Sequence, residues 1–115
     1  MLSSTELDLA KRKEIALKIA VNCTQLLQEK FGAKRVILFG SLAGQTPWHN
    51  RSDIDLAVEG LPEGNFFQAY AACRQLLTQE LQLDLLALED VYPEMRSRIL
   101  QGIDMTDNSI ILYRN

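Results

Sequence analysis

The fold of this chain is decided by the stretch RVILFGSLAGQTPWHNRSDIDLAV, which occupies residues 35–58. Its first part, residues 35–39, is apolar and β-rich, and it breaks at Gly40 and Ser41. A strand ends in this way where the backbone approaches a phosphate. Residues 42–44 fit one helical turn with Ser41 at its N-cap. The free backbone N–H groups of such a turn would favour an anion. The cap alone would also explain the serine, but the whole pattern predicts a binding loop.

After a loop of eleven residues, two carboxylates open the second part of the stretch. Residues 53–58 alternate polar and apolar side chains, so a strand there places Asp53 and Asp55 on one face, roughly 6.6 Å apart along the backbone. Two carboxylates beside a phosphate-binding turn need a cation between them and the phosphates, and hard oxygen ligands favour Mg²⁺. The spacing therefore indicates nucleotide chemistry.

A third carboxylate, Asp84, is the only charge in the apolar run 81–88, which predicts a further strand. A charged group with such neighbours is costly unless it is paired or ligated. An aspartate on the exposed face of the strand would also fit. With Asp53 and Asp55 already present, Asp84 on a neighbouring strand is better explained as a catalytic base or a third metal ligand.

Length and composition predict one compact domain over residues 1–115, because 115 residues, 47% of them apolar, leave no room for a second core. We expect an N-terminal helix over about 4–31 and a catalytic core over about 33–113. No run approaches the roughly 18 apolar residues that cross a bilayer, and the N-terminus lacks the order of a signal peptide. We therefore expect a cytoplasmic protein without membrane contact.

The net charge of −3 argues against direct nucleic-acid binding, because phosphate neutralisation supplies most nonspecific affinity. A nucleotide held through Mg²⁺ remains compatible with an acidic chain. The basic cluster formed by residues 11–13 and Lys18 fits a solvated helix face or, as an alternative, a surface that docks a partner.

Helical patterns flank the strands. Ser3 and Glu6 form a capping box before the first apolar repeat, and a second repeat predicts a helix of about sixteen residues over 66–81. Pro93 opens a short helix over 94–100 that stops at Gly102, and residues 109–113 predict a last edge strand. Helices and four strands in this order specify an α/β fold.

Four further side chains have less specific patterns. Trp48 could cover a nucleobase, contact a partner or simply pack, and His49 in the same polar loop fits a solvated side chain better than a substrate contact. Cys23 and Cys73 lie at apolar helical positions without metal-ligand spacing. We expect both cysteines to be buried thiols.

The glycine–serine pair, the spacer, the Asp53-x-Asp55 motif and the later Asp84 together resemble the nucleotidyltransferase superfamily of the DNA polymerase β type. Three passages, residues 36–41, 52–58 and 98–102, are similar to the minimal nucleotidyltransferases. Those proteins are the antitoxins of HEPN/MNT toxin–antitoxin pairs. The resemblance covers residues 33–113. A single DxD motif is weak, whereas the ordered set in its strand contexts is specific.

The resemblance implies a nucleotidyltransferase-type fold (α+β) with a small mixed sheet of about four strands and helices packed against it. It implies that Gly40 and Ser41 bind the nucleotide phosphates. It also implies that Asp53, Asp55 and Asp84 form the catalytic and Mg²⁺-binding set, with Asp84 assisting the attacking hydroxyl. The implied reaction transfers AMP from ATP to a tyrosine of a partner HEPN ribonuclease toxin, which silences it.

Two departures from the family pattern leave alternatives open. Members often have an arginine in the turn after the serine, whereas residues 42–45 here are Leu-Ala-Gly-Gln, and the spacer is one residue longer than is common. The first alternative is an antitoxin that acts by binding alone. The second is a transferase for a small molecule such as an aminoglycoside, although such enzymes usually carry an acceptor-binding domain that these residues do not supply.

Overall fold

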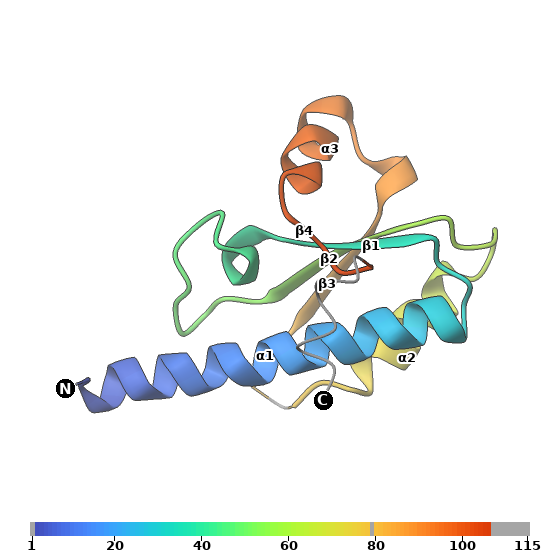
Figure 1. Ribbon diagram of the computed structural model, residues 1–115. Coiled ribbons are helices and arrows are strands. Elements are labelled where there is room, and N and C mark those ends of the chain that lie inside the picture. The colour runs from blue at the N-terminus through green and yellow to red at the C-terminus, as the bar shows by residue number, and fades with distance from the viewer. Residues whose placement is uncertain (1, 79, 107–115) are drawn as a thin grey trace.

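The computed structural model describes residues 2–78 and 80–106. Figure 1 shows its elements from the long N-terminal helix to the last short strand. In chain order they are α1 (Ser4–Glu29), β1 (Arg35–Phe39), the 3₁₀ turn η1 (Gly40–Ala43), β2 (Ile54–Glu59), α2 (Phe66–Arg74), β3 (Leu83–Ala87), the 3₁₀ turn η2 (Leu88–Asp90), α3 (Pro93–Leu100) and β4 (Ile103–Asp104).

The described strands form one mixed sheet in the order β3-β2-β1-β4. Strand β1 runs antiparallel to β2 and β4, and β2 runs parallel to β3. The predicted α/β class and small four-stranded sheet are confirmed. The fourth strand, however, is β4, whose two exposed residues carry no alternating pattern. The tail strand expected over residues 109–113 lies outside the described residues.

Helices cover both faces of the sheet, with α1 and α2 on one side and α3 on the other (Figure 1). Alternate strand residues divide between two cores in the same way. Val36 and Leu56 join the larger core under α1 and α2, whereas Ile37 and Ala57 join a smaller core with α3. Asp55 is two residues from Ala57, so its side chain lies on the α3 face of the sheet.

Helix α1 begins as predicted. The Ser3 hydroxyl oxygen accepts a hydrogen bond from the Glu6 N–H at 3.2 Å, and the Glu6 carboxylate accepts one from the Ser3 N–H at 3.3 Å. This is the expected capping box. The helix ends at Glu29, two residues earlier than predicted, because the chain turns toward β1 through Gly32, which has a φ of 74°.

The N-terminal half of α1 is fastened to the loop that precedes β2. The Trp48 indole N–H donates to the Leu9 carbonyl at 3.1 Å, and the Arg12 guanidinium donates to the Ser52 carbonyl at 3.2 Å. Arg12 also lies 6.0 Å from the centre of the Trp48 ring, within cation–π range. Trp48 therefore packs against α1, and Arg12 departs from the solvated face expected for the basic cluster.

Helix α2 is shorter than predicted, because it ends at Arg74 instead of continuing to Leu81. The N–H groups of residues 76 and 77 donate to carbonyls three residues earlier, so the chain tightens and leaves the helix. It must then turn back to pair with β2, where the Gln82 carbonyl accepts from Ile54 at 2.9 Å. The apolar repeat continues past the helix because Leu81 still packs into the larger core.

The two cysteines join α1 to α2. Cys23 and Cys73 are free and fully buried, as predicted. The Cys23 Sγ donates to the Cys73 carbonyl at 3.9 Å. Hydrogen bonding to Cys73 and burial raise the pKa of the Cys23 thiol, so it stays protonated and serves as a small apolar core residue.

Helix α3 begins at Pro93 and ends at Leu100, close to the predicted bounds. The helix stops just before Gly102, as predicted, and the Gly102 N–H donates to the Ile99 carbonyl at 2.9 Å. A Cβ atom at this position would lie 2.3 Å from the Leu38 carbonyl oxygen. Glycine is therefore required for close passage over β1, which lets the chain continue directly into β4.

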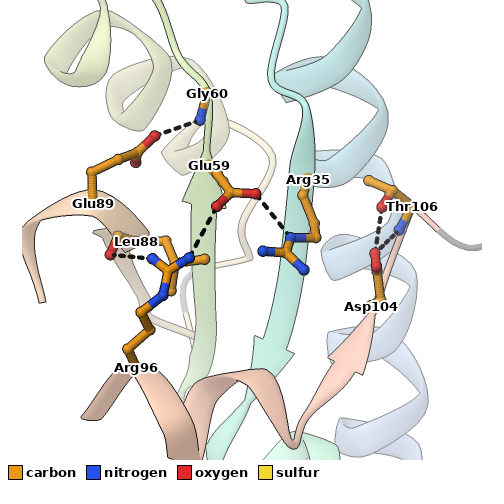
Figure 2. Close-up of polar contacts among 8 residues, drawn as sticks. All are labelled: Arg35, Glu59, Gly60, Leu88, Glu89, Arg96, Asp104 and Thr106. Carbon is orange, nitrogen blue, oxygen red and sulfur yellow. Dashed lines mark hydrogen bonds and ion pairs between the residues drawn. The ribbon is translucent and has the colours of Figure 1, made fainter. Parts of the chain in front are cut away.

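At the end of β2 away from Asp55, Glu59 holds α3 to the strands (Figure 2). Its carboxylate pairs with the Arg35 Nε at 3.0 Å and with the Arg96 Nη2 at 3.3 Å. Arg96 also donates to the Leu88 carbonyl at 3.3 Å. Hydrogen bonding from Arg35 lowers the pKa of Glu59, so the ionised form is favoured in the folded protein.

We predict that Glu59→Gln lowers the free energy of unfolding by about 1 kcal/mol at pH 7, because it weakens two partly exposed ion pairs. The folded-state pKa of Glu59 is depressed, so this contribution is present above the unfolded-state pKa and fades as pH falls through the folded-state value. Urea unfolding at pH 7 and pH 3 should show a smaller difference from wild type at pH 3. The exposed Glu63→Gln is the matched control, and an equal loss at both pH values would contradict the prediction.

Candidate active site

Strand register brings the predicted carboxylates to one end of the sheet. In the parallel pairing of β2 with β3, Asp55 lies opposite Asp84. Asp53 directly precedes β2 and has the same parity as Asp55, so its side chain is on the same face. In the antiparallel pairing of β1 with β2, Phe39 lies opposite Asp55, which places Gly40 beside it. Residues separated by up to 44 positions thus meet beside one turn.

Gly40 lies in direct contact with the Asp55 carboxylate. A Cβ atom on Gly40 would lie 2.3 Å from Asp55 Oδ2, and the residue has a φ of 72°, which favours glycine. Both facts disfavour a side chain at this position. The glycine therefore lets the backbone of the turn approach the Asp55 carboxylate closely.

The three aspartates interact electrostatically. Burial, followed by the charges of Asp84 and Asp53, raises the pKa of Asp55 from its ordinary 3.8 to about 6. Asp55 is half-buried, Asp53 is also half-buried and Asp84 is exposed. Near neutral pH the negative charge of Asp55 is therefore opposed by its burial and by the charges of its two neighbours.

Mg²⁺ fits these residues by donor chemistry, because carboxylate oxygens are its preferred protein ligands and a cation would relieve the repulsion around Asp55. Over residues 2–78 and 80–106, however, no three acidic, histidine or cysteine side chains are grouped tightly enough to form a ready-made metal site. The aspartates form a carboxylate cluster that a bound metal would have to draw closer together.

The turn after β1 differs from the prediction at Ser41. Phe39, not Ser41, occupies the N-cap position of η1, and no side chain caps the turn. Gly40, with its positive φ, lets the chain enter the turn two residues earlier than predicted. Ser41 therefore lies inside the turn, with only 9% of its surface exposed. The predicted roles of Gly40 and Ser41 in phosphate binding stay predictions.

Gln45 bridges the turn to helix α3. Its side-chain oxygen accepts a hydrogen bond from the Gly40 N–H at 2.7 Å, and its side-chain nitrogen donates to the Arg98 carbonyl at 2.8 Å. The two partners fix the orientation of the amide, since one is a donor and the other an acceptor. Sequence patterns give no signal for this bridge, because Arg98 is 53 residues away.

A cavity of about 610 Å³ opens beside this bridge. It lies between the end of β1 with the following turn and helix α3, and its walls are mainly apolar and aromatic. The lining residues are Phe39, Gly40, Gln45, Thr46, Tyr92, Met95, Arg98, Ile99 and Gln101. Gly40 belongs both to this cavity and to the Asp55 contact, so Gly40 separates the cavity from Asp55, and none of the three aspartates lines the cavity.

His49 has a structural role in the loop before β2. Its Nδ1 accepts a hydrogen bond from the Arg51 N–H at 3.1 Å, and its own N–H donates to the Ser52 hydroxyl at 2.9 Å. These local contacts shape the loop that delivers Asp53 to the sheet. Neither His49 nor Trp48 contributes to the cavity lining.

Comparison with known proteins gives one match that covers most of the chain. The family model described as polymerase beta, nucleotidyltransferase, matches residues 21–110. The matched range includes the glycine–serine turn and all three aspartates. No curated protein matches the chain. Of the helices that the structure describes, none combines the length and apolar character needed to cross a membrane.

We predict that Asp55→Asn raises the free energy of unfolding by roughly 1 kcal/mol at pH 7 in EDTA, because it removes a carboxylate held against its neighbours. The folded-state pKa of Asp55 is raised, so wild type loses stability as pH rises from about 4 through about 6. Urea unfolding should show the gain at pH 7 and little gain at pH 4. Asp90→Asn, at an exposed position in η2, is the control. A variant no more stable than wild type at pH 7 would refute this reading of the cluster.

Proposed function

The chain belongs to the polymerase β nucleotidyltransferase family, and on this premise we propose that it is a Mg²⁺-dependent nucleotidyltransferase that acts as an antitoxin. In this proposal it transfers AMP from ATP to a tyrosine of a partner HEPN-type ribonuclease toxin. One observation carries the transfer step: strand register gathers Asp53, Asp55 and Asp84 beside the Gly40 turn. The partner and the acceptor tyrosine rest on the resemblance of the sequence motifs.

The proposed roles follow from the geometry. Asp53, Asp55 and Asp84 would hold Mg²⁺, which when bound neutralises negative charge on phosphate oxygens. The acceptor hydroxyl attacks the α-phosphorus of ATP, a new oxygen–phosphorus bond forms, and the bond to pyrophosphate breaks. Asp84 is exposed at the edge of the cluster, where it can orient the hydroxyl and accept its proton.

An acceptor carried by a partner protein fits the construction of the site. Asp84 is exposed, and helices, 3₁₀ turns and strands take up most of the described residues. A tyrosine on the surface of another protein could therefore reach the carboxylates directly. A small free acceptor would need walls around Asp84, and the lining of the 610 Å³ cavity does not include that residue.

A second candidate function is neutralisation of the partner by binding alone. Two observations favour it. The turn after Ser41 lacks a cation, and the Gly40 N–H, which would donate to a phosphate, is occupied by the Gln45 side chain. Both weaken the case for tight triphosphate binding without affecting the carboxylates.

We expect Mg²⁺ to raise the melting temperature of the wild-type protein and EDTA to reverse the effect, because a ligand that binds only the folded state stabilises it by mass action. The double variant Asp53→Asn/Asp55→Asn should gain nothing from Mg²⁺, whereas the Asp90→Asn control should respond like wild type. Thermal unfolding at increasing MgCl₂ concentrations measures this. An equal Mg²⁺ response of the double variant would place the metal elsewhere.

The proposed activity is tested by incubating the purified protein with its partner, Mg²⁺ and α-labelled ATP. We expect the label on a partner tyrosine, located by mass spectrometry of peptides. Asp53→Ala/Asp55→Ala should abolish transfer while circular dichroism and urea unfolding show a folded protein. Asp90→Ala is the matched control.

Two results would overturn the transfer proposal. One is label transfer that persists in the double alanine variant. The other is full neutralisation of the partner by that variant without any nucleotide adduct, which would establish the binding-only function instead.

A further inference from the structure

Helix α3 brings one cationic side chain to the cavity beside the carboxylates. Among the described residues that line the cavity, Arg98 is the only one with a positive charge. It lies in the last turn of α3 and is exposed. Within residues 2–78 and 80–106, its guanidinium takes part in none of the ion pairs, which involve Lys18, Arg35 and Arg96. Arg98 is therefore available to a ligand.

The Gln45 bridge fixes the backbone of Arg98 close to the turn that begins at Gly40. A single side-chain amide spans from the Gly40 N–H, at 2.7 Å, to the Arg98 carbonyl, at 2.8 Å. The two walls of the cavity are thus joined at residue 98. A guanidinium attached there starts next to the turn, although it comes from an element 53 residues further along the chain than Gln45.

Charge balance indicates what such a group would bind. The carboxylates lie on the α3 face at the end of the sheet, and a metal held there neutralises only the phosphate oxygens that it contacts. The turn after Ser41 has no basic residue, and the Gly40 N–H already has an acceptor. The phosphate oxygens of a triphosphate that the metal does not contact need a hydrogen-bond donor from the other wall of the cavity, which is helix α3. An arginine fork matches phosphate oxygens in geometry and charge.

We infer that Arg98 of helix α3 is the triphosphate-binding cation of this site, taking the place of the cation that the turn after Ser41 lacks. This inference rests on the proposed function in that it assumes a nucleoside triphosphate as the ligand. It assigns a binding role to a residue that is not one of the three aspartates. The alternative is a purely structural role, in which Arg98 only complements the negative end of the α3 dipole. Its replacement would then change the free energy of unfolding and leave nucleotide binding unchanged.

The test is titration calorimetry of the full chain with Mg²⁺-ATP and, separately, with Mg²⁺-AMP, which lacks the β- and γ-phosphates. Arg98→Ala should weaken ATP binding about tenfold or more, because it removes charge-assisted hydrogen bonds, and should change AMP binding by less than about threefold. Arg98→Lys should retain part of the ATP affinity. Arg74→Ala, exposed on α2 across the sheet, is the matched control. Urea unfolding of each variant separates binding from stability.

The outcomes distinguish this inference from the proposed function. ATP affinity of Arg98→Ala equal to wild type, or equal losses for ATP and AMP, would overturn the role of Arg98. Wild-type protein that binds no ATP would overturn it as well. Wild-type protein that binds ATP but transfers no label would overturn the proposed activity, while the comparison of ATP with AMP would still decide the role of Arg98.

Discussion

The candidate site depends on the register in which β2 pairs with both of its neighbours. That register sets Asp55 opposite Phe39 on one side and opposite Asp84 on the other. The pleat of a strand alternates with a period of two, so a slip of one residue would turn the carboxylates into the core under α1 and α2. Burial of Ile54 and Leu56, both fully inaccessible on that opposite face, opposes such a slip. Burial of the apolar face of β2 thus fixes the register that places Asp55 beside Asp84 and the Gly40 turn.

The same arrangement carries an electrostatic cost. Asp55 is held beside two like charges and is partly desolvated, which its raised pKa records. This repulsion is offset by favourable contacts elsewhere. They are the two cores on either side of the sheet and the ion pairs of Glu59 at its far end. Repulsion of this kind is expected where a protein keeps charged groups for a ligand rather than for its own stability.

Local signals in the sequence predicted much of this structure, and long-range contacts account for what they missed. The capping box of α1, the run into Gly40 and the alternation after Asp53 depend on neighbouring residues, and each corresponds to an element. The end of α2 is set by the need to reach β3, and β4 by the passage of Gly102 over β1, so neither has a local pattern. A shared face for Asp53 and Asp55 could be predicted because strand parity is local, whereas the Asp55–Asp84 register and the Gln45 bridge join residues that only the fold brings together.

The attachment of α1 to the loop before β2 makes the first turns of that helix part of the support of the candidate site. Leu9 and Arg12 anchor Trp48 and Ser52, and Ser52 is the residue immediately before Asp53. The segment around Leu9 and Arg12 contributes no fully buried side chain, so it has little core packing of its own to hold it in place. Two hydrogen bonds and one cation–π contact therefore tie its position to the loop that ends at Asp53. Shortening α1 from its N-terminus would remove these contacts, which join residues some forty positions apart along the chain.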